Sequence, residues 1–341
     1  MNVILLFGGK SEEYEISLRS AAAILPALSP EHTPLPVGIT REGEWYACPD
    51  VTADAIREDR WQDGRLLPVS FAPNQRGFLF GGEPVQADCV FPVLHGTNGE
   101  DGRVQGLLEL LAIPYVGCRA LTGAIGMDKT VVKTMAAAAG IPVARGTEVR
   151  MAELSDPGIR ERSEKTLSYP FFVKPVLSGS SRGSGRVTAR DEMLPALYAA
   201  CAFGGRALCE ELICGAEVEY ALLERDGQLF GNTVGEVDPD GAFYDYDAKY
   251  KSRASRIFIP ARVGSRAMAK VREYGKRLFY LLGCRGLARI DFFVRQDGEV
   301  LFNEINTMPG FTDISMYPML MHFAGLSLPE VVNVLLKNAV L

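Results

Sequence analysis

The sequence contains no apolar run long enough to cross a membrane as a helix, and it has no excess of basic residues. Its 36 Lys and Arg are outnumbered by 42 Asp and Glu, which gives a formal charge of −6. These absences count against a membrane-spanning protein and against a general nucleic-acid-binding protein. Any anionic ligand must therefore be bound by cations that are placed locally.

Paired cysteines are also missing. The seven cysteines are odd in number and are scattered without C-x-x-C spacing, which disfavours a disulfide framework and favours a reducing compartment. The apolar start, MNVILLFGG, has no basic segment and is expected to form a first strand, not a signal peptide. We therefore expect a cytoplasmic protein.

The dinucleotide fingerprint G-x-G-x-x-G does not follow the expected first strand, Val3 to Phe7. Its absence disfavours an oxidoreductase that uses a dinucleotide. Instead, Gly8-Gly9-Lys10-Ser11 leads into a helix that is expected from about 12 to 28, and a helix N-terminus can hold an anion. The order of strand, glycine turn and helix predicts an α/β unit.

The chain length predicts more than one domain. Its 341 residues exceed the size at which a single core usually stops growing, so two or three domains are expected, and a hydrophobic content of 47% suffices for their cores. Further strands are expected at 36–39 and 87–94. The segment 49–74 has few long apolar runs and is expected to be irregular and peripheral.

The stretch RIDFFVRQDGEVLFNEINTMPG, residues 289–310, indicates two strands joined by a tight turn at Asp297-Gly298. Asp-Gly is a strong signal for a type I′ turn, which needs positive φ at both central residues. A two-residue turn places Gln296 opposite Glu299, and this sets the register of the whole hairpin.

That register places Asp291 opposite Glu304 and Arg289 opposite Asn306, with all four side chains on one face. Two adjacent carboxylates repel each other unless a cation lies between them. Oxygen ligands favour a hard cation such as Mg²⁺, which usually also binds waters and substrate phosphates. The hairpin therefore predicts a magnesium–nucleotide site, with Arg289 available for a developing negative charge. The alternative is a surface hairpin with ordinary ion pairs.

Three further features could contribute to a site. The polar loop HGTNGEDG, residues 95–102, follows a strand and is expected at the carboxyl edge of the sheet, where α/β folds bind ligands. Glu15, early in the first helix, either faces the same crevice or complements the helix dipole. Lys174 lies alone in the apolar strand expected at 169–176, so its amine either pairs with an anion or reaches solvent at the strand end.

Two polar segments are candidates for ligand-binding loops. Ser178 to Arg186, SGSSRGSGR, has small residues whose N–H groups can cradle a phosphate, although it lacks the G-x-x-x-x-G-K-[ST] spacing. It could equally be a flexible hairpin tip. The tyrosine-rich segment 235–256 is long for a loop within a domain, which favours a lid.

Eight motifs in this order resemble the ATP-grasp superfamily and, within it, the D-alanine–D-alanine ligases. They are FGGKSEEYEIS (7–17), HGTNGEDG (95–102), MDK (127–129), VKP (173–175), GSS (179–181), EVDPDGAFYDYDAKY (236–250), ARIDFF (288–293) and FNEINTMPGFT (302–312). The similarity covers almost the whole chain. GITREGEWY (38–46) and FPVLHGTNGEDG (91–102) are similar to the branch that includes the D-alanine–D-serine ligases of VanG-type vancomycin resistance.

The resemblance implies an ATP-grasp fold preceded by a Rossmann-like α/β domain. The expected limits are 1–120 for the N-terminal α/β domain, 121–210 for a central ATP-grasp subdomain, and 211–341 for a C-terminal subdomain. The last of these would carry the metal site and the lid loop 235–256.

The resemblance also implies roles for matching residues. Asp291, Glu304 and Asn306 would bind two Mg²⁺ ions, with Mn²⁺ as a substitute. The ATP phosphates would contact Lys129, Lys174, Ser180 and Ser181, and the adenosine would contact Glu210, Glu211, Ile213 and Glu217. Glu15 would bind the ammonium of the first D-alanine, and His95 would lie beside the amino-acid sites. Arg289 and the Gly310 N–H would form an oxyanion site, Ser315 would bind the second carboxylate, and Lys249 and Tyr250 would close over the substrates. Glu15, Ser180, Tyr250, Arg289, Gly310 and Ser315 would be the catalytic set.

The implied reaction makes D-alanyl-D-alanine for peptidoglycan precursors. The carboxylate of the first D-alanine attacks the γ-phosphate of ATP and becomes an acyl phosphate, and the amine of the second substrate then displaces phosphate. Because the first step brings two anions together, the site must supply cations and fixed dipoles. A lid is expected because water would hydrolyse the acyl phosphate.

Some choices stay open within this resemblance. Met316 is apolar, which favours D-alanine as the second substrate, but a D-alanine–D-serine ligase is the alternative. Arg182 stands where the family commonly has an apolar residue, and it either adds a cation near the phosphates or faces solvent. A catalytically inactive nucleotide-binding regulator is disfavoured because Arg289, Glu304 and Lys249 are present. The family also implies a homodimer.

Overall fold

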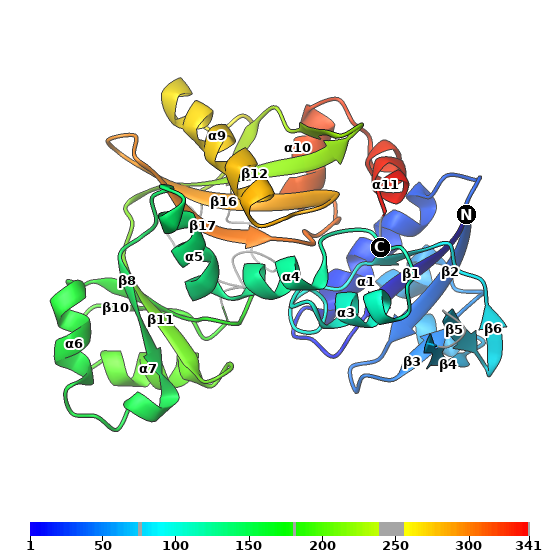
Figure 1. Ribbon diagram of the computed structural model, residues 1–341, viewed down its shortest axis with the longest axis horizontal. Helices are drawn as coiled ribbons and strands as arrows, with labels where there is room; N and C mark the ends of the chain where they lie inside the picture. Colours follow the sequence, from blue (N-terminus) through cyan, green and yellow to red (C-terminus); the bar gives the residue numbers. More distant parts are fainter. Residues whose placement is uncertain (74–76, 180–181, 239–255, 340–341) are drawn as a thin grey trace.

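The computed structural model describes residues 1–73, 77–179, 182–238 and 256–339. The protein is mixed α/β, and its described strands form three sheets that follow one another along the chain (Figure 1). The N-terminal sheet, the four-stranded sheet and the six-stranded sheet each carry their own helices. The fold class expected from the sequence is confirmed. The expected domain limits at 120 and 210 stay predictions.

The N-terminal sheet has the order β6-β5-β4-β3-β2-β1-β7. Its parallel part, at one end of the sheet, consists of β2 (Thr33–Ile39), β1 (Asn2–Gly8) and β7 (Cys89–Pro92). The antiparallel strands β3 (Trp45–Ala47), β4 (Leu67–Ala72), β5 (Gly77–Phe80) and β6 (Glu83–Val85) extend it on one side. Two short helical segments, α2 (Ala53–Arg57) and a 3-10 turn at Trp61–Asp63, precede β4.

Alternate residues of β1 are buried in two different cores. Leu5 belongs to the core that contains helix α1 (Tyr14–Ile24), and Leu6 belongs to the core that contains α3 (Arg103–Leu110). This is the pattern of a strand that is covered on both faces. The segment 49–74 is not peripheral as expected, because it includes β4 and because the buried Trp61 packs edge-on against Phe7, with ring centroids 5.4 Å apart.

The four-stranded sheet has the order β10-β9-β11-β8 and is antiparallel. Its strands are β8 (Gly146–Arg150), β9 (Phe171–Pro175), β10 (Gly185–Val187) and β11 (Arg206–Glu211). Helices α6 (Ile159–Thr166) and α7 (Met193–Cys201) cover it, and together they enclose a separate hydrophobic core. Figure 1 shows this unit as a lobe apart from the N-terminal sheet.

The six-stranded sheet has the order β15-β14-β12-β16-β17, with β13 paired to β12. Its strands are β12 (Gly215–Arg225), β13 (Gln228–Phe230), β14 (Val234–Asp238), β15 (Arg256–Phe258), β16 (Leu287–Arg295) and β17 (Val300–Asn306). Its helices are α4 (Ala120–Met127), α5 (Lys129–Ala138), α9 (Ser265–Leu281), α10 (Met316–Phe323) and α11 (Leu328–Lys337). The described ends of the expected lid, at 235–238 and 256, are therefore paired strands, and residues 239–255 lie outside the described residues.

The β16–β17 hairpin has the expected pairs but not the expected turn. Arg295 and Glu299 pair across a three-residue loop, and positive φ occurs at Gly298 but not at Asp297, so the predicted two-residue type I′ turn is wrong. This loop shifts the register by one residue. A β-bulge that leaves Asn303 between the pairs Phe292–Phe302 and Asp291–Glu304 shifts it back. The two deviations cancel, so Asp291 still faces Glu304 and Arg289 still faces Asn306.

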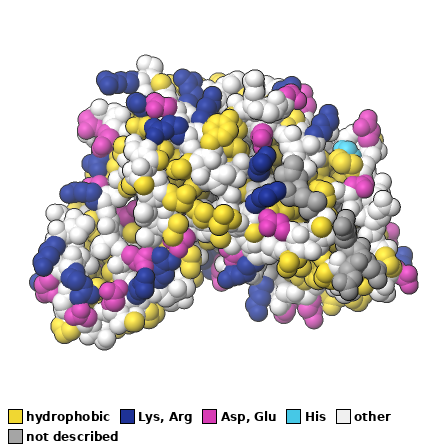
Figure 2. Space-filling model, in the orientation of Figure 1, with side chains coloured by type: hydrophobic (Ala, Val, Ile, Leu, Met, Phe, Trp, Pro, Cys, Tyr) yellow, Lys and Arg dark blue, Asp and Glu magenta, His cyan; other side chains and the backbone are white. Residues whose placement is uncertain are grey.

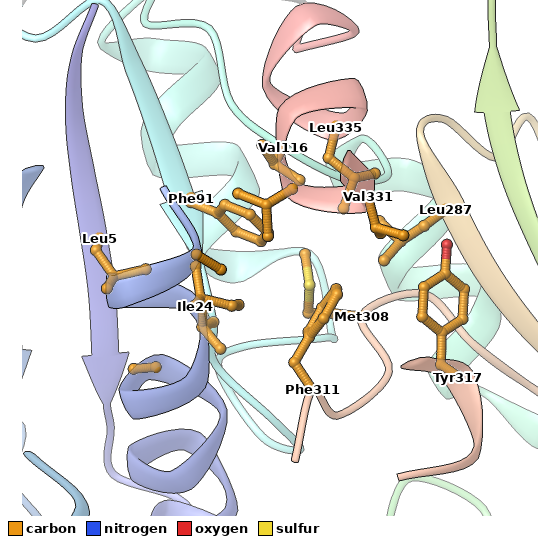
Figure 3. Packing of buried hydrophobic residues seen from close by; sticks show 14 of the residues in the cluster. Leu5, Ile24, Phe91, Val116, Leu287, Met308, Phe311, Tyr317, Val331 and Leu335 are labelled. Carbon is orange, nitrogen blue, oxygen red and sulfur yellow. The ribbon is translucent and has the colours of Figure 1, made fainter. Parts of the chain in front are cut away.

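One hydrophobic cluster joins the N-terminal sheet to the C-terminal helices (Figure 3). Phe91 from β7 and Ile24 from α1 meet Phe311, Tyr317 and Leu335 from the C-terminal part. Phe311 lies edge-on to both Phe91 and Tyr317, with centroid distances of 5.9 and 5.7 Å. The segment after β17 is therefore anchored between the two parts of the molecule.

Charges of both signs are interspersed on the face shown in Figure 2, and neither sign dominates the lobe that holds the four-stranded sheet. In the described part of the chain, no single helix is long and apolar enough to span a membrane. Helices α10 and α11 pass such a test only when taken together, and they meet at a bend of 100°.

Candidate active site

A cavity of about 470 Å³ lies between the four-stranded and the six-stranded sheet, and we call it the inter-sheet cavity. This volume is within the range of small-molecule and cofactor sites. The sequence-predicted residues that line it are Lys129, Lys174, Glu210, Glu211, Ile213, Glu217, Asp291 and Glu304. The structure therefore brings residues from four predicted motifs to one cavity.

A buried cluster of charges forms one wall of the inter-sheet cavity. Glu210 on β11 contacts Lys133 at 2.5 Å and Lys174 at 2.6 Å, and all three side chains are at most 10% exposed. Burial alone would raise the pKa of Glu210, but the two ammonium groups outweigh it and lower that pKa. Burial likewise disfavours charged Lys174, but Glu210 and Glu304 raise the pKa of Lys174 above its usual value.

Lys174 is therefore charged at neutral pH, and a phosphate chain placed against it meets a fixed positive charge. Burial lowers the pKa of Lys133 to about 8. Glu211 has a different environment, because its carboxylate pairs with Arg145 at 3.1 Å and with Arg295 at 2.9 Å. The side chain of Glu211 is thus held by arginines at the rim of the cavity.

Arg289 is held by two carboxylates. Its guanidinium lies 2.8 Å from Glu219 on β12 and 2.7 Å from Asp291 on β16, and the three side chains are almost fully buried. Burial opposes the charge, but Asp291 and Glu219 raise the pKa of Arg289 well above its usual value. Two hydrogen bonds to Asp291, of 2.9 and 2.7 Å, fix the plane of the guanidinium.

The donor set of Asp291, Glu304 and Asn306 fits a hard divalent cation. Asn306 donates to Asp291 at 3.1 Å, so the amide oxygen of Asn306 is its remaining donor for a cation. Glu304 is partly exposed and lies 3.7 Å from the ammonium of Lys129. The described residues hold no cluster of three or more His, Cys, Asp or Glu side chains, so any metal here needs the Asn306 oxygen and ligands from the substrate.

A smaller cavity of about 60 Å³ adjoins the first. Half of its lining residues lie in loops, and we call it the loop-walled cavity. It shares Lys129 and Glu304 with the inter-sheet cavity. Among the predicted residues it is also lined by His95, Arg289, Asn306 and Gly310. Glu13 and Glu100 line it as well, although the sequence analysis assigned a role to neither.

The structure does not bring Glu15 to either cavity. The Glu15 carboxylate is half-exposed and pairs with Arg41 at 2.9 Å, and Arg41 in turn lies over the Tyr14 ring. Glu13 lines the loop-walled cavity instead, with its carboxylate close to Gly96 and Gly179. Glu13 is the N-cap residue of α1 and Glu15 lies two residues later in its first turn, so the two side chains do not share a face.

His95 is buried, and both of its ring nitrogens have partners. Nδ1 lies 3.0 Å from the carbonyl oxygen of Met308, and Nε2 lies 3.1 Å from the hydroxyl of Ser20. Burial lowers the pKa of His95, which therefore stays neutral. His95 lies beside the cavity as expected, but its hydrogen-bonding groups are directed to protein atoms.

Ser315 and Met316 differ in their surroundings. Ser315 is the residue before α10, and its hydroxyl lies 2.8 Å from that of Thr312 and 2.8 Å from the position that a Cβ on Gly310 would occupy. Met316 is buried against Gly235 in the hydrophobic cluster of Figure 3 and lines neither cavity. The structure therefore does not bring Met316 to the site as a specificity residue.

Four predicted residues, Ser180, Ser181, Lys249 and Tyr250, lie outside the described residues. Arg182 forms an ion pair with Glu12, so the segment after β9 contacts the loop that precedes α1. A role of Arg182 near the phosphates stays a prediction.

Sequence reasoning missed Glu13, Lys133, Glu219 and Asn303. Lys133 follows Lys129 by one helical turn, so its spacing was a usable signal. Asn303 reaches the cavity only because of the β-bulge, and its side chain accepts from Lys174 at 3.2 Å. Glu219 pairs with Arg289 from a neighbouring strand, which no local pattern reveals.

Comparison with known proteins assigns the chain to a family. The family described as D-ala D-ala ligase N-terminus matches residues 2–118, and D-ala D-ala ligase C-terminus matches residues 135–337. This chain belongs to the D-alanine–D-alanine ligase family. A D-alanine–D-alanine ligase of Chlorobium phaeovibrioides is 41% identical over 99% of this chain and 97% of its own length. A D-alanine–D-alanine ligase of Acetivibrio thermocellus is 41% identical over 99% of this chain and 95% of its own length.

Solved structures of the D-alanine–D-alanine ligase family give the same assignment. The VanG D-Ala:D-Ser ligase from Enterococcus faecalis superposes with a TM-score of 0.91 at 37% identity, covering 99% of both chains. The D-alanine–D-alanine ligase from Coxiella burnetii gives a TM-score of 0.87 at 30% identity, and the match covers 99% of this chain and 93% of that one. The fold is the ATP-grasp fold, and the protein is an ATP-dependent ligase of this family.

Proposed function

We propose that this protein joins two D-alanine molecules into D-alanyl-D-alanine at the expense of ATP, in the cytoplasm, for peptidoglycan precursors. The observation that carries the proposal is the connection between the two cavities. The inter-sheet cavity has the size of a nucleotide site and is lined by Lys129 and Lys174. At Lys129 and Glu304 it adjoins the loop-walled cavity, which is lined by Glu13 and Arg289. A reaction between a nucleotide phosphate and a small zwitterion needs this arrangement of charges.

The nucleotide is proposed to lie in the inter-sheet cavity. Glu210, Glu211, Ile213 and Glu217 line this cavity and are proposed to contact adenosine. Lys129 and Lys174 also line it and are proposed to contact the phosphates. Ser180 and Ser181 remain the proposed phosphate contacts of the glycine-rich loop. The fixed charge of Lys174 next to Glu210 supports its role, because the lysine is held in place before the nucleotide arrives.

Asp291, Glu304 and Asn306 are proposed to hold the two Mg²⁺ ions, or Mn²⁺ in their place. When bound, these ions neutralise phosphate charge and so reduce the repulsion that an attacking carboxylate meets. Asp291 has a second task in this proposal. It orients Arg289 through two hydrogen bonds, so a metal ligand and the oxyanion-binding guanidinium are fixed to each other.

Glu13, and not Glu15, is proposed to bind the ammonium group of the first D-alanine. Glu13 lines the same small cavity as Arg289 and Gly310, whereas Glu15 is paired with Arg41 outside it. An ammonium at Glu13 leaves the carboxylate of the substrate free to approach the γ-phosphate near Lys129. That carboxylate attacks the phosphorus, ADP leaves, and an acyl phosphate forms.

In the second step the amine of the second substrate attacks the acyl carbon, and phosphate is expelled. Arg289 and the N–H of Gly310 are proposed to stabilise the negative oxygen of the tetrahedral intermediate. Ser315, at the N-terminus of α10, is proposed to bind the carboxylate of the second substrate. Lys249 and Tyr250 stay the proposed lid residues that exclude water.

A D-alanine–D-serine ligase is the second candidate. The observation that favours it is the TM-score of 0.91 to the VanG D-Ala:D-Ser ligase. The homodimer implied by the family is also a proposal.

The test supplies Mg²⁺–ATP with D-alanine alone and then with an equal amount of D-serine, and measures phosphate release and the mass of the products. Mostly D-alanyl-D-alanine in the mixture supports the first candidate. Mostly D-alanyl-D-serine supports the second, and no phosphate release in either mixture rejects both. Light scattering of the same sample tests the homodimer.

A further inference from the structure

The short segment Thr307 to Phe311, which follows β17, carries Gly310 and is anchored by its side chains. Met308 and Phe311 are both at most 2% exposed and enter the hydrophobic cluster that joins the N-terminal sheet to α10 and α11 (Figure 3). Apolar packing fixes the position of the segment, but it does not by itself set the direction of a peptide N–H.

Polar contacts from the N-terminal part set that direction. His95 Nδ1 contacts the carbonyl oxygen of Met308 at 3.0 Å, and His95 Nε2 contacts Ser20 Oγ at 3.1 Å. The backbone N–H of Phe311 donates to the same Ser20 Oγ at 3.0 Å. Ser20, His95, Met308 and Phe311 thus form a closed ring of hydrogen bonds that brackets Pro309 and Gly310.

The direction of every hydrogen bond in this ring follows from chemistry. A carbonyl oxygen only accepts, so the proton of neutral His95 is on Nδ1. Nε2 is then an acceptor, so the Ser20 hydroxyl donates to it. The lone pairs of Ser20 Oγ accept from Phe311. Each group has the one role that its neighbours require, so removal of the Ser20 hydroxyl leaves a buried nitrogen and a buried N–H without their partner.

Gly310 lies inside the ring and lines the loop-walled cavity. No described residue accepts a hydrogen bond from the Gly310 N–H. Met308 and Phe311, on either side of it, are both fixed by the ring. A Cβ on Gly310 would come within 2.8 Å of Ser315 Oγ, so the segment is packed too closely for a side chain there.

We infer that Ser20 is a positioning residue, which acts through His95 and Phe311 to aim the Gly310 N–H at the oxygen that becomes negative in the reaction. This inference rests on the proposed function and assigns to helix α1 a task that none of the sequence motifs indicates. Donors that are fixed before the reaction cost no reorganisation in the transition state, so Ser20 is expected to affect turnover more than ground-state binding.

The test compares Ser20→Ala with Ser17→Ala in the full-length protein. Ser17 is the matched control, because it lies one turn earlier on α1, is fully buried, and accepts from Gly8 N–H and donates to Val93. Its partners, Gly8 of β1 and Val93 after β7, take part in none of the hydrogen bonds of the ring. Ser20→Thr restores the hydroxyl, and Ser20→Cys keeps the volume while replacing the strong donor with a weak one.

For Ser20→Ala we expect kcat to fall roughly ten- to hundredfold, with the KM for ATP changed less than about twofold. Ser17→Ala should keep kcat within about threefold of the wild type, and Ser20→Thr should recover most of it. A phosphinate analogue of the tetrahedral intermediate should bind Ser20→Ala more weakly by the same factor as kcat falls. If Ser20→Ala does not fold, Ser20→Cys replaces it with the same expectation.

Three results would overturn the inference. They are a kcat of Ser20→Ala equal to that of Ser17→Ala, a loss that appears only in the KM for ATP, and unchanged binding of the phosphinate. In each case the wild type still makes the dipeptide, so the proposed function stands. A wild type that makes no dipeptide contradicts the proposed function instead.

Discussion

The two cavities are built in different ways. The inter-sheet cavity is walled mainly by β9, β11, β12, β14, β16 and β17, and its charged side chains project from paired strands. The loop-walled cavity combines loop residues before α1, after β7 and after β17 with Arg289, Glu304 and Asn306 of β16 and β17. Strand residues are held by a regular ladder, whereas loop residues depend on specific contacts such as those of His95 with Met308 and Ser20.

The predicted residues are distributed unequally between the two cavities. Every residue predicted to contact the nucleotide lines the inter-sheet cavity, among those that the structure describes, and its role stays a prediction. Of the predicted amino-acid contacts, Glu15, Ser315 and Met316 do not line the loop-walled cavity, whereas Glu13 does. Strand alternation predicted only the pairs of the β16–β17 hairpin, and the other roles came from the resemblance.

The largest expected effect concerns the metal site that borders the inter-sheet cavity. Glu304→Gln should lower turnover roughly a thousandfold or more, because it removes a negative charge from the proposed metal site. Glu299→Gln, on the same hairpin but exposed and paired with Arg295, should keep turnover within about twofold. Phosphate release at saturating Mg²⁺ measures both. Near-normal turnover of Glu304→Gln would show that the metal assignment is wrong.

The next largest effect concerns the loop-walled cavity. Glu13→Gln should lower kcat/KM for D-alanine roughly tenfold to hundredfold, because a buried charge-assisted hydrogen bond to the ammonium is lost. Glu15→Gln should change it less than about threefold, because the Glu15–Arg41 pair is half-exposed. Initial rates across D-alanine concentrations distinguish the two variants. The reverse order of effects would restore Glu15 as the ammonium site.

A third effect concerns the charge cluster of the inter-sheet cavity. Lys133→Met should destabilise the protein by roughly 1–3 kcal/mol and raise the KM for ATP, since Glu210 then has a single ammonium partner in a buried site. Lys270→Met, on an exposed face of α9 where the lysine pairs with Glu273, should cost at most about 0.5 kcal/mol. Urea unfolding of both variants measures the difference. Equal stability losses would mean that the Lys133–Glu210 pair contributes no more than a surface pair.

The smallest effect is the pH dependence of His95. Its pKa is lowered in the folded protein by burial, so the stability it contributes is present above the unfolded pKa of about 6.5 and is lost as pH falls below it. The loss should reach up to about 1 kcal/mol between pH 7.5 and 5.5. Urea unfolding at several pH values measures it in the wild type and in His95→Asn.

The groups around His95 make the comparison with the variant necessary. Glu13 and Arg289 face His95 and act on its pKa in opposite directions. Burial raises the pKa of Glu100 to about 8, so the stability from Glu100 is lost as pH rises, which is the opposite trend. The His95 contribution is therefore the difference between the wild type and His95→Asn. Parallel pH curves for the two would mean that His95 titrates normally.

The hairpin shows how a correct site can follow from an incorrect turn. The pairs Asp291–Glu304 and Arg289–Asn306 are confirmed, but they depend on a three-residue loop and a bulge at Asn303 that the Asp-Gly signal does not predict. A bulge adds one residue to a strand without changing its composition, so alternation over seven residues cannot locate it. The bulge also brings Asn303 to Lys174, a contact that a regular strand would not make.

The sequence alone determined the order of the motifs, the α/β class, the family and the carboxylate pairs of the hairpin, because these depend on residue type and on short spacing. Only the tertiary structure decided which acidic residue of the segment 12–15 enters the cavity, since that depends on how the start of α1 packs against the loops at Gly96 and Gly179. It also decided the proton position on His95 and the partner of Ser20. Those contacts join residues that are 75 to 291 positions apart, and no local pattern encodes such a distance.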